Sequence, residues 1–187
     1  MAALVAGRKV QTRRLATSPL AKCQPGDLLY VREAFCPDWS STLVYKADDP
    51  TGRAAREAGY AAEPKYRPSI HMPRKASRLT LEVVEVRRQY LCEISDDDAT
   101  AEGIAAVSKD GWLVKYGLPD RDGLPGQDDH GWPWERWQLT PQRAFEHLWR
   151  SLHGHESWEE NPVVVALTFC VHQQNVDKLF RKCDTAQ

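Results

Sequence analysis

The chain has 187 residues, a length that suits a single domain with one sizeable core. Its 25 lysines and arginines are balanced by 26 aspartates and glutamates, which excludes a global positive field and leaves only a local basic patch for contacting nucleic acid. No apolar run approaches the roughly 20 residues that span a bilayer, and the stretch from Met1 to Ala6 is too short for a signal peptide, so we predict a cytoplasmic protein with no membrane partner.

The N-terminal third is predicted to contain short elements joined by loops. Residues Ala2 to Ala6 favour a helix that ends at Gly7. The apolar and aromatic run from Leu28 to Phe35 predicts a strand, and Thr42 to Ala47 predicts a second strand that could pair with it as a hairpin. The following segment is loop-like, apart from a short helix expected at Gly52 to Ala58.

The middle of the chain carries clearer signals. From Ser77 to Leu91 the apolar residues alternate with a period of two and then change phase, which predicts a long strand with a bulge. Ser95, followed by three aspartates, is typical of a helix N-cap, and Gly103 is placed to end that helix. A long bulged strand suits a small barrel.

A segment of 35 residues, Ala105 to Leu139, shows no periodicity, and we predict a long irregular excursion from the core fold. It is rich in glycine, proline and aspartate and carries four tryptophans: Trp112, Trp132, Trp134 and Trp137. Tryptophans in a long loop usually pack onto the core, so we expect at least two of the four to do so. The alternative is that they stack nucleobases.

The last third begins with the most secure helix. Thr140 is a typical N-cap with proline at the first helical position, and the apolar face that follows ends near Gly154. The β-branched run from Val163 to Val171 predicts a core strand, and residues 172–187 form a polar tail for which a fraying helix is the expectation.

Cysteines and histidines give no indication of a metal or cofactor. The five cysteines are an odd number without a C-x-x-C pair, which fits reduced thiols better than a disulfide framework or a zinc ribbon. The pair His153 and His155 lacks a third ligand nearby, and no aspartate group has the spacing of a calcium loop. We therefore predict no metal and no cofactor.

The basic segment near the chain start has the spacing G-x-K-x-x-T-x-R, with Gly7, Lys9, Thr12 and Arg14 at the named positions. This pattern resembles the signature of the ASCH family, small domains similar to the PUA fold of RNA-binding proteins. Three further stretches are similar to the phage and prophage branch of that family: residues 25–33, 67–74 and 94–103. The resemblance covers Gly7 to Glu102 and Pro141 to Phe169, and it leaves the tryptophan-rich excursion aside.

The resemblance implies an α+β fold, a PUA-like (ASCH) β-barrel with peripheral helices and a long irregular insertion at about 105–139. It implies a single domain over residues 1–171, followed by the tail. Relatives in this branch carry a short strand before the helix that precedes the glycine, whereas this sequence begins inside that helix. We therefore expect either a start upstream of Met1 or a barrel that lacks one edge strand.

Some members of the family hydrolyse the N4-acetyl amide of acetylcytidine. Their catalytic lysine, threonine and glutamate fall on Lys9, Thr12 and Glu102 of this sequence, and Arg14 closes the signature. Amide hydrolysis needs a nucleophile, a base and an acid. Thr12 supplies a hydroxyl, and Lys9 is a base only where burial and nearby positive charges favour its neutral amine. Glu102 could instead keep Lys9 protonated, or activate a water itself; the sequence leaves both readings open.

The expected partner is a nucleoside or RNA. The predicted binding residues are basic and come from two segments: Arg13 and Arg14, then Arg67, His71 and Arg74. The second group reads equally well as two surface arginines and an interior histidine. The leading functional hypothesis is an amidohydrolase for N4-acylated cytidine-type nucleosides. The alternatives are a non-catalytic RNA-binding module, in which the same basic residues hold phosphate and the tryptophans stack bases, and a ribonuclease that uses the same cleft. A reading without function is also open, in which Lys9 to Thr12 form a turn and Glu102 is a solvated helix residue. The sequence gives no indication of the oligomeric state.

Overall fold

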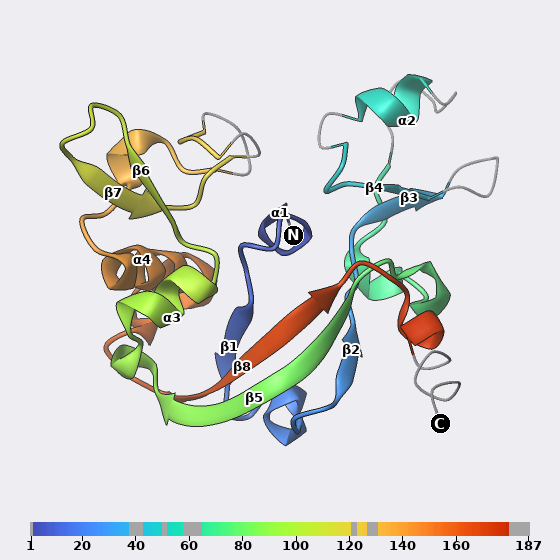
Figure 1. Cartoon of the computed structure of the whole chain (residues 1–187), viewed down its shortest axis with the longest axis horizontal. Coiled ribbons are helices and arrows are strands. Elements are labelled where there is room, and N and C mark those ends of the chain that lie inside the picture. Colours follow the sequence, from blue (N-terminus) through green and yellow to red (C-terminus); the bar gives the residue numbers. More distant parts are fainter. Residues whose placement is uncertain are drawn as a thin grey trace. The chain divides into compact units, whose positions relative to one another are not determined.

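The computed structural model describes residues 2–37, 43–49, 52–57, 65–120, 123–126 and 131–179. These residues form a mixed α+β structure with a curled antiparallel sheet in the manner of a half-barrel (Figure 1). The chain divides into two compact units. The first comprises Met1–Val5, Leu28–Glu82 and Val171–Gln187, and the second comprises Ala6–Asp27 and Val83–Cys170. The α+β class is confirmed, and the PUA-like assignment stays a prediction.

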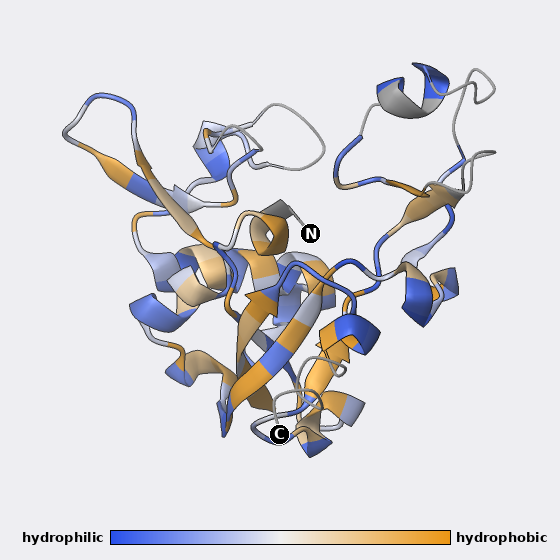
Figure 2. Ribbon diagram, turned by 45° about the vertical axis from the view of Figure 1, so that its right-hand side comes forward, coloured by the Kyte–Doolittle hydropathy of each residue, from blue (hydrophilic) through white to orange (hydrophobic). Residues whose placement is uncertain are grey.

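The main sheet has the strand order β1-β8-β5-β2. Its strands are β1 (Gln11–Leu15), β8 (Val163–His172), β5 (Thr80–Tyr90) and β2 (Leu28–Tyr30). β1 runs antiparallel to β8 with Gln11 opposite Thr168, and β2 runs antiparallel to β5 with Leu28 opposite Glu82. Figure 2 shows that apolar residues are concentrated along the strands of the sheet. The long strands expected at 77–91 and 163–171 are confirmed within a few residues at each end.

The second unit places two helices beside β1. These are α3 (Asp96–Ala101) and α4 (Pro141–His153), accompanied by the 3-10 turns Pro19–Lys22, Leu91–Glu93, Trp134–Arg136 and His155–Ser157. Their apolar residues form one cluster with the sheet: Leu91, Ile94, Ala99, Ile104, Ala144, Phe145, Trp149 and Val164. Burying this cluster packs both helices against β8, the strand that contains Val164 and pairs with β1.

Both helices begin and end at the residues that the sequence indicates. Ser95 Oγ accepts a hydrogen bond from Asp98 N, and Thr140 Oγ1 accepts one from Arg143 N. α3 ends at Gly103, whose φ of 105° only glycine adopts readily, and α4 ends at Gly154 with a φ of 100°.

The predicted irregular excursion contains a β-hairpin, which corrects the expectation. β6 (Ala105–Ser108) pairs with β7 (Val114–Gly117), and Asp110 accepts backbone hydrogen bonds from two residues of the turn. The strands are short and their pattern is only weakly apolar, so no period of two stands out in the sequence. Polar residues occupy the hairpin tip (Figure 2).

The tryptophans of this segment behave as expected for packing. Trp137 is 2 % exposed, its indole N–H donates to Trp132 O, and Trp132 packs against the core cluster with its ring edge-on to His147 of α4. Trp132 and Trp137 therefore pack against the protein, Trp132 on the core cluster and Trp137 beside Gly117 of β7. The expected packing onto the barrel itself stays a prediction. Trp112 is the exception, because 93 % of it is exposed at the hairpin tip.

The first unit contains α1 (Ala2–Val5), β3 (Phe35–Pro37), β4 (Leu43–Tyr45), α2 (Arg53–Glu57) and the 3-10 turns Ser69–His71 and Arg74–Ala76. The single strand expected at Leu28 to Phe35 is wrong, because β2 ends at Tyr30 and β3 begins at Phe35. Between them the buried carboxylate of Glu33 forms two hydrogen bonds with Arg78, at 2.9 Å each. That buried ion pair fixes an irregular backbone between the strands.

Three smaller expectations on this unit have mixed outcomes. The hairpin of the second predicted strand exists, with Phe35 opposite Tyr45, but Thr42 itself lies outside the described residues. The short helix expected at 52–58 is present as α2, and Ala58 lies outside the described residues. In the tail, residues 176–179 are helical and residues 180–187 lie outside the described part. No helix in the described chain is both long and apolar enough to span a bilayer.

Candidate functional site

The basic segment is a strand, and its side chains alternate between two faces. Gln11 and Arg13 of β1 point to the face covered by α3, and Thr12 and Arg14 point to the other face. The first three residues of the strand are buried and the last two are exposed. The two signature residues within the strand, Thr12 and Arg14, therefore lie on the face away from α3, with Thr12 buried and Arg14 exposed.

Glu102 lies where α3 ends, and the hydrogen bonds around it fix its position. Gly103 N donates to Thr100 O and Ile104 N donates to Ala99 O, a pairing that ends the helix directly after Glu102. The backbone of the segment before β1 docks on the same turn, because Val10 N donates to Ala101 O at 2.8 Å. Lys9 is thereby held next to the end of α3.

Lys9 and Glu102 form a close ion pair. Lys9 Nζ lies 2.5 Å from Glu102 Oε2 and also donates to the backbone oxygen of Glu102 at 3.0 Å. The Glu102 side chain is 4 % exposed and that of Lys9 is 22 % exposed. A cation at a helix C-terminus is favourable in itself. Solvent therefore reaches this pair mainly along the Lys9 side chain.

Arg13 holds the other oxygen of the same carboxylate. Its guanidinium is fully buried and lies 3.3 Å from Glu102 Oε1, 2.6 Å from Asp98 Oδ2 and 2.5 Å from Gln11 Oε1. Its charge also lies 5.7 Å from the centre of the Phe145 ring. Both terminal nitrogens of Arg13 are therefore bonded to protein groups, while its buried Nε has no hydrogen-bond partner among the described residues. This burial favours a role in positioning Glu102 over direct contact with a ligand.

Asp98 extends the network to β5. Its Oδ1 accepts hydrogen bonds from Gln11 Nε2 at 3.1 Å and from Arg87 Nη2 at 2.8 Å. Burial alone would raise the pKa of Asp98, but the hydrogen bonds from Arg87 and Gln11 and the nearby positive charges outweigh it and hold that pKa below its usual value. The hydrogen bond to Asp98 raises the pKa of Arg87.

Sequence reasoning missed Asp98, Gln11 and Arg87. One signal for Asp98 was available, because it precedes Glu102 by four residues and the two must share a helix face. Gln11 and Arg87 could be found only from the pairing of strands distant in the sequence.

Thr12 and Arg14 form a separate pair. Arg14 Nη1 donates to Thr12 Oγ1 at 3.1 Å and to Arg13 O at 2.7 Å. Thr12 is 8 % exposed. Among the hydrogen bonds of the described residues, none joins the Thr12 hydroxyl to Lys9 or Glu102. The structure thus pairs Lys9 with Glu102, whereas the described hydrogen bonds of the Thr12 hydroxyl lead to Arg14.

The other predicted binding residues belong to the first unit. Arg67 and His71 are exposed, and Arg67 forms two backbone hydrogen bonds with Phe35. Arg74 is paired with Asp177 at 2.9 Å and lies over the ring of Tyr30. The interior position considered for His71 is therefore wrong, whereas contact with phosphate stays a prediction for all three.

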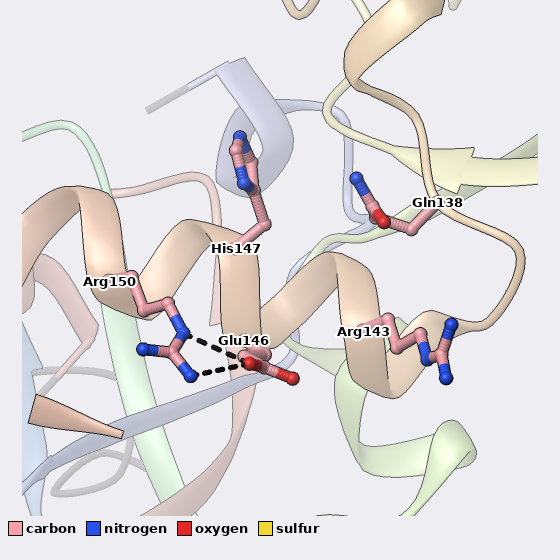
Figure 3. A pocket seen from close by; sticks show the side chains of 5 residues that line it. All are labelled: Gln138, Arg143, Glu146, His147 and Arg150. Carbon is pink, nitrogen blue, oxygen red and sulfur yellow. Dashed lines mark hydrogen bonds and ion pairs between the residues drawn. The ribbon is translucent and has the colours of Figure 1, made fainter. Parts of the chain in front are cut away.

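A polar pocket of about 440 Å³ lies along α4 (Figure 3). Its lining is Gln138, Arg143, Glu146, His147 and Arg150. Arg150 is engaged with Glu146 and with Glu159, at 2.8 Å and 2.5 Å, and His147 points away from this ion pair. These contacts account for Arg150 and Glu146 as a stabilising ion pair on the surface of the helix.

Metal-binding groups do not gather in the described part of the chain, where no three side chains of histidine, cysteine, aspartate or glutamate come together. Cys23, Cys92 and Cys170 carry free thiols, and burial raises the pKa of Cys23 and Cys92.

Comparisons with protein-family models, with curated proteins and with solved structures give no match.

Proposed function

We propose that the protein is an amidohydrolase for N4-acylated cytidine-type nucleosides, with Lys9 and Glu102 as its catalytic pair. The observation that carries the proposal is the 2.5 Å contact between Lys9 Nζ and Glu102 Oε2, in which the Glu102 side chain is buried and the Lys9 side chain is partly exposed. The resemblance to the ASCH signature supplies the substrate class.

The proposed mechanism uses this pair as an ammonium and a carboxylate, and not the neutral amine considered from the sequence. A cation suits the task of binding the carbonyl oxygen of an acyl group, where negative charge develops during hydrolysis.

Glu102 then acts as the base. A water attacks the acyl carbon and gives its proton to the Glu102 carboxylate, while the Lys9 ammonium donates to the oxygen that becomes negative. When the tetrahedral intermediate collapses, the proton on Glu102 passes to the leaving N4 nitrogen, and the products are a carboxylic acid and the free cytidine. Arg13 positions Glu102 by holding its second oxygen. In this scheme water is the nucleophile, and Thr12 lies on the strand face of Arg14.

The test is hydrolysis of a panel of N4-acylated cytidines by the unmodified protein and by Glu102→Gln. Removing the carboxylate should lower turnover by roughly 10²-fold or more with the fold intact. Asp97→Asn is the matched control, because Asp97 is an exposed carboxylate on the same helix. It should leave turnover unchanged. No hydrolysis of any member of the panel by the unmodified protein would reject the proposal.

A non-catalytic RNA-binding module is the second candidate, and one observation favours it. Trp112 is exposed at the hairpin tip, and Lys109 and Lys115 of the hairpin lie 4.9 Å and 5.0 Å from the half-buried ring of Trp134. An exposed aromatic ring and two lysines on one hairpin suit single-stranded RNA. Under this alternative, Trp112→Ala weakens binding of a short RNA at fixed salt, and Glu102→Gln leaves RNA affinity unchanged or raises it because a negative charge is lost.

A further inference from the structure

Asp98 is the acidic group of the buried network that the hydrolytic scheme leaves unused. It precedes Glu102 by four residues, a spacing that puts both side chains on one face of α3, and its side chain is 15 % exposed. Arg13 contacts both carboxylates, with Nη2 2.6 Å from Asp98 Oδ2 and Nη1 3.3 Å from Glu102 Oε1. One buried cation is therefore shared by two carboxylates.

Arg13 is not shared equally between them. A hydrogen bond from a guanidinium to a carboxylate usually spans about 2.7–2.9 Å. The contact of Arg13 with Asp98 is shorter than this range, and its contact with Glu102 is longer. The nitrogen that faces Glu102 also donates to Gln11 Oε1 at 2.5 Å. Arg13 is thus bound mainly to Asp98 and Gln11, and its hold on Glu102 is weak.

Asp98 is fixed in place and carries a negative charge. Its Oδ1 accepts hydrogen bonds from Gln11 Nε2 at 3.1 Å and from Arg87 Nη2 at 2.8 Å, and its backbone N–H donates to Ser95 Oγ at 3.1 Å. Burial alone would raise the pKa of Asp98, but the hydrogen bonds from Arg87 and Gln11 and the charge of Arg13 hold that pKa below its usual value. Asp98 is therefore a carboxylate at neutral pH.

A general base benefits from such a competitor for its cations. A carboxylate held closely by two cations is a weak base, because each cation favours the charged form. Glu102 already has the Lys9 ammonium at 2.5 Å. A second close cation would weaken it further. The charge of Asp98 draws Arg13 toward itself, which leaves Glu102 with one close cation.

We propose that Asp98 is a positioning residue of the hydrolytic site, which acts through Arg13 by holding the guanidinium where it orients Glu102 without neutralising it. This inference rests on the proposed function and extends it to a residue that takes no part in the scheme. The described side-chain partners of Asp98 are Gln11, Arg13 and Arg87, so the account gives Asp98 no contact with the substrate.

The experiment measures kcat and KM for N4-acetylcytidine at pH 7 in the full chain, with tryptophan fluorescence to show that each variant is folded. Asp98→Asn removes the charge at nearly constant size and should lower kcat roughly 3- to 10-fold, the effect of strengthening one hydrogen bond to the base. KM should stay unchanged, because no substrate contact is lost. Asp98→Ser is a second neutral variant of different shape, and it should lower kcat to a similar extent.

Two comparisons separate this role from a merely structural one. Asp98→Glu keeps the charge and should recover most of the kcat that Asp98→Asn loses. Asp97→Asn removes an exposed carboxylate from the same helix and should leave both constants unchanged. In an Arg13→Met background, Asp98→Asn should change kcat by less than about twofold, because its effect passes through Arg13.

Several results would overturn the proposal while leaving the hydrolytic function intact. These are an unchanged kcat in a folded neutral variant, an equal loss from Asp98→Asn with and without Arg13, or a raised KM at unchanged kcat. Where Arg13→Met does not fold, equal kcat values for Asp98→Asn and Asp98→Glu would have the same meaning. An unmodified protein that hydrolyses no N4-acylated cytidine would reject the proposed function, and this role with it.

Discussion

Replacing Arg13 by methionine tests whether the buried network, rather than any surface feature, holds β1 to α3. Methionine keeps an apolar chain of similar length and removes only the guanidinium. Glu102 would retain Lys9, and Asp98 would retain Arg87, so each carboxylate loses one of its cations. Two hydrogen bonds to carboxylates, of about 1.5–3 kcal/mol each, are lost together with the one to Gln11 Oε1. This loss is of the same order as the roughly 3–5 kcal/mol typical when one partner of a buried ion pair is removed.

The assay is urea unfolding at pH 7 followed by tryptophan fluorescence. Six of the seven tryptophans lie in the second unit, so the signal reports mainly on the unit that contains Arg13. Arg143→Met is the matched control, because Arg143 is an exposed arginine on α4 in the same unit. We expect the control to change the free energy of unfolding by about 0.5 kcal/mol or less. A loss below about 1 kcal/mol for Arg13→Met, similar to a surface pair, would refute the buried-network account.

Two further predictions concern the same unit. The folded-state pKa of Asp98 is below its ordinary value, so its ionisation stabilises the fold above about pH 4, and this contribution is lost as the pH falls through the lowered pKa. Urea unfolding between pH 3 and pH 7 should therefore show that the difference in unfolding free energy between the unmodified protein and Asp98→Asn shrinks toward acid pH. A difference that grows toward acid pH would contradict this sign. A Cβ at Gly117 would lie 2.6 Å from the buried Trp137 ring, so Gly117→Ala should cost about 1–3 kcal/mol of folding free energy in the same assay, whereas an unchanged unfolding midpoint would show that the ring can move.

The elements that the sequence predicts well are those fixed by local chemistry. Ser95 and Thr140 begin their helices because each supplies an oxygen to a free backbone N–H three residues later. Gly103 and Gly154 end them because the chain turns there with a positive φ. These signals act within a few residues, so no knowledge of the tertiary structure is needed to read them.

The candidate site was predictable only in part. Lys9 and Glu102 came from a family resemblance, and their contact joins residues that are 93 positions apart. In the sequence, the segment around Thr12 is a basic cluster with no sign of a strand. Only when it is known to be a strand does the alternation of side chains between two faces separate Thr12 from Arg13. Arg13 is buried because Asp98 and Glu102, at α3, neutralise its charge. The sequence of β1 alone does not indicate these partners.

The most direct test of the account is a double-mutant cycle on hydrolysis of N4-acetylcytidine, using Lys9→Met, Glu102→Gln and the double variant. If the two side chains act as one catalytic unit, each single substitution lowers kcat/KM by roughly 10²-fold or more, and the double variant is little worse than either. Effects that multiply in the double variant would show two independent contributions, and an unmodified protein without measurable hydrolysis would contradict the central claim outright.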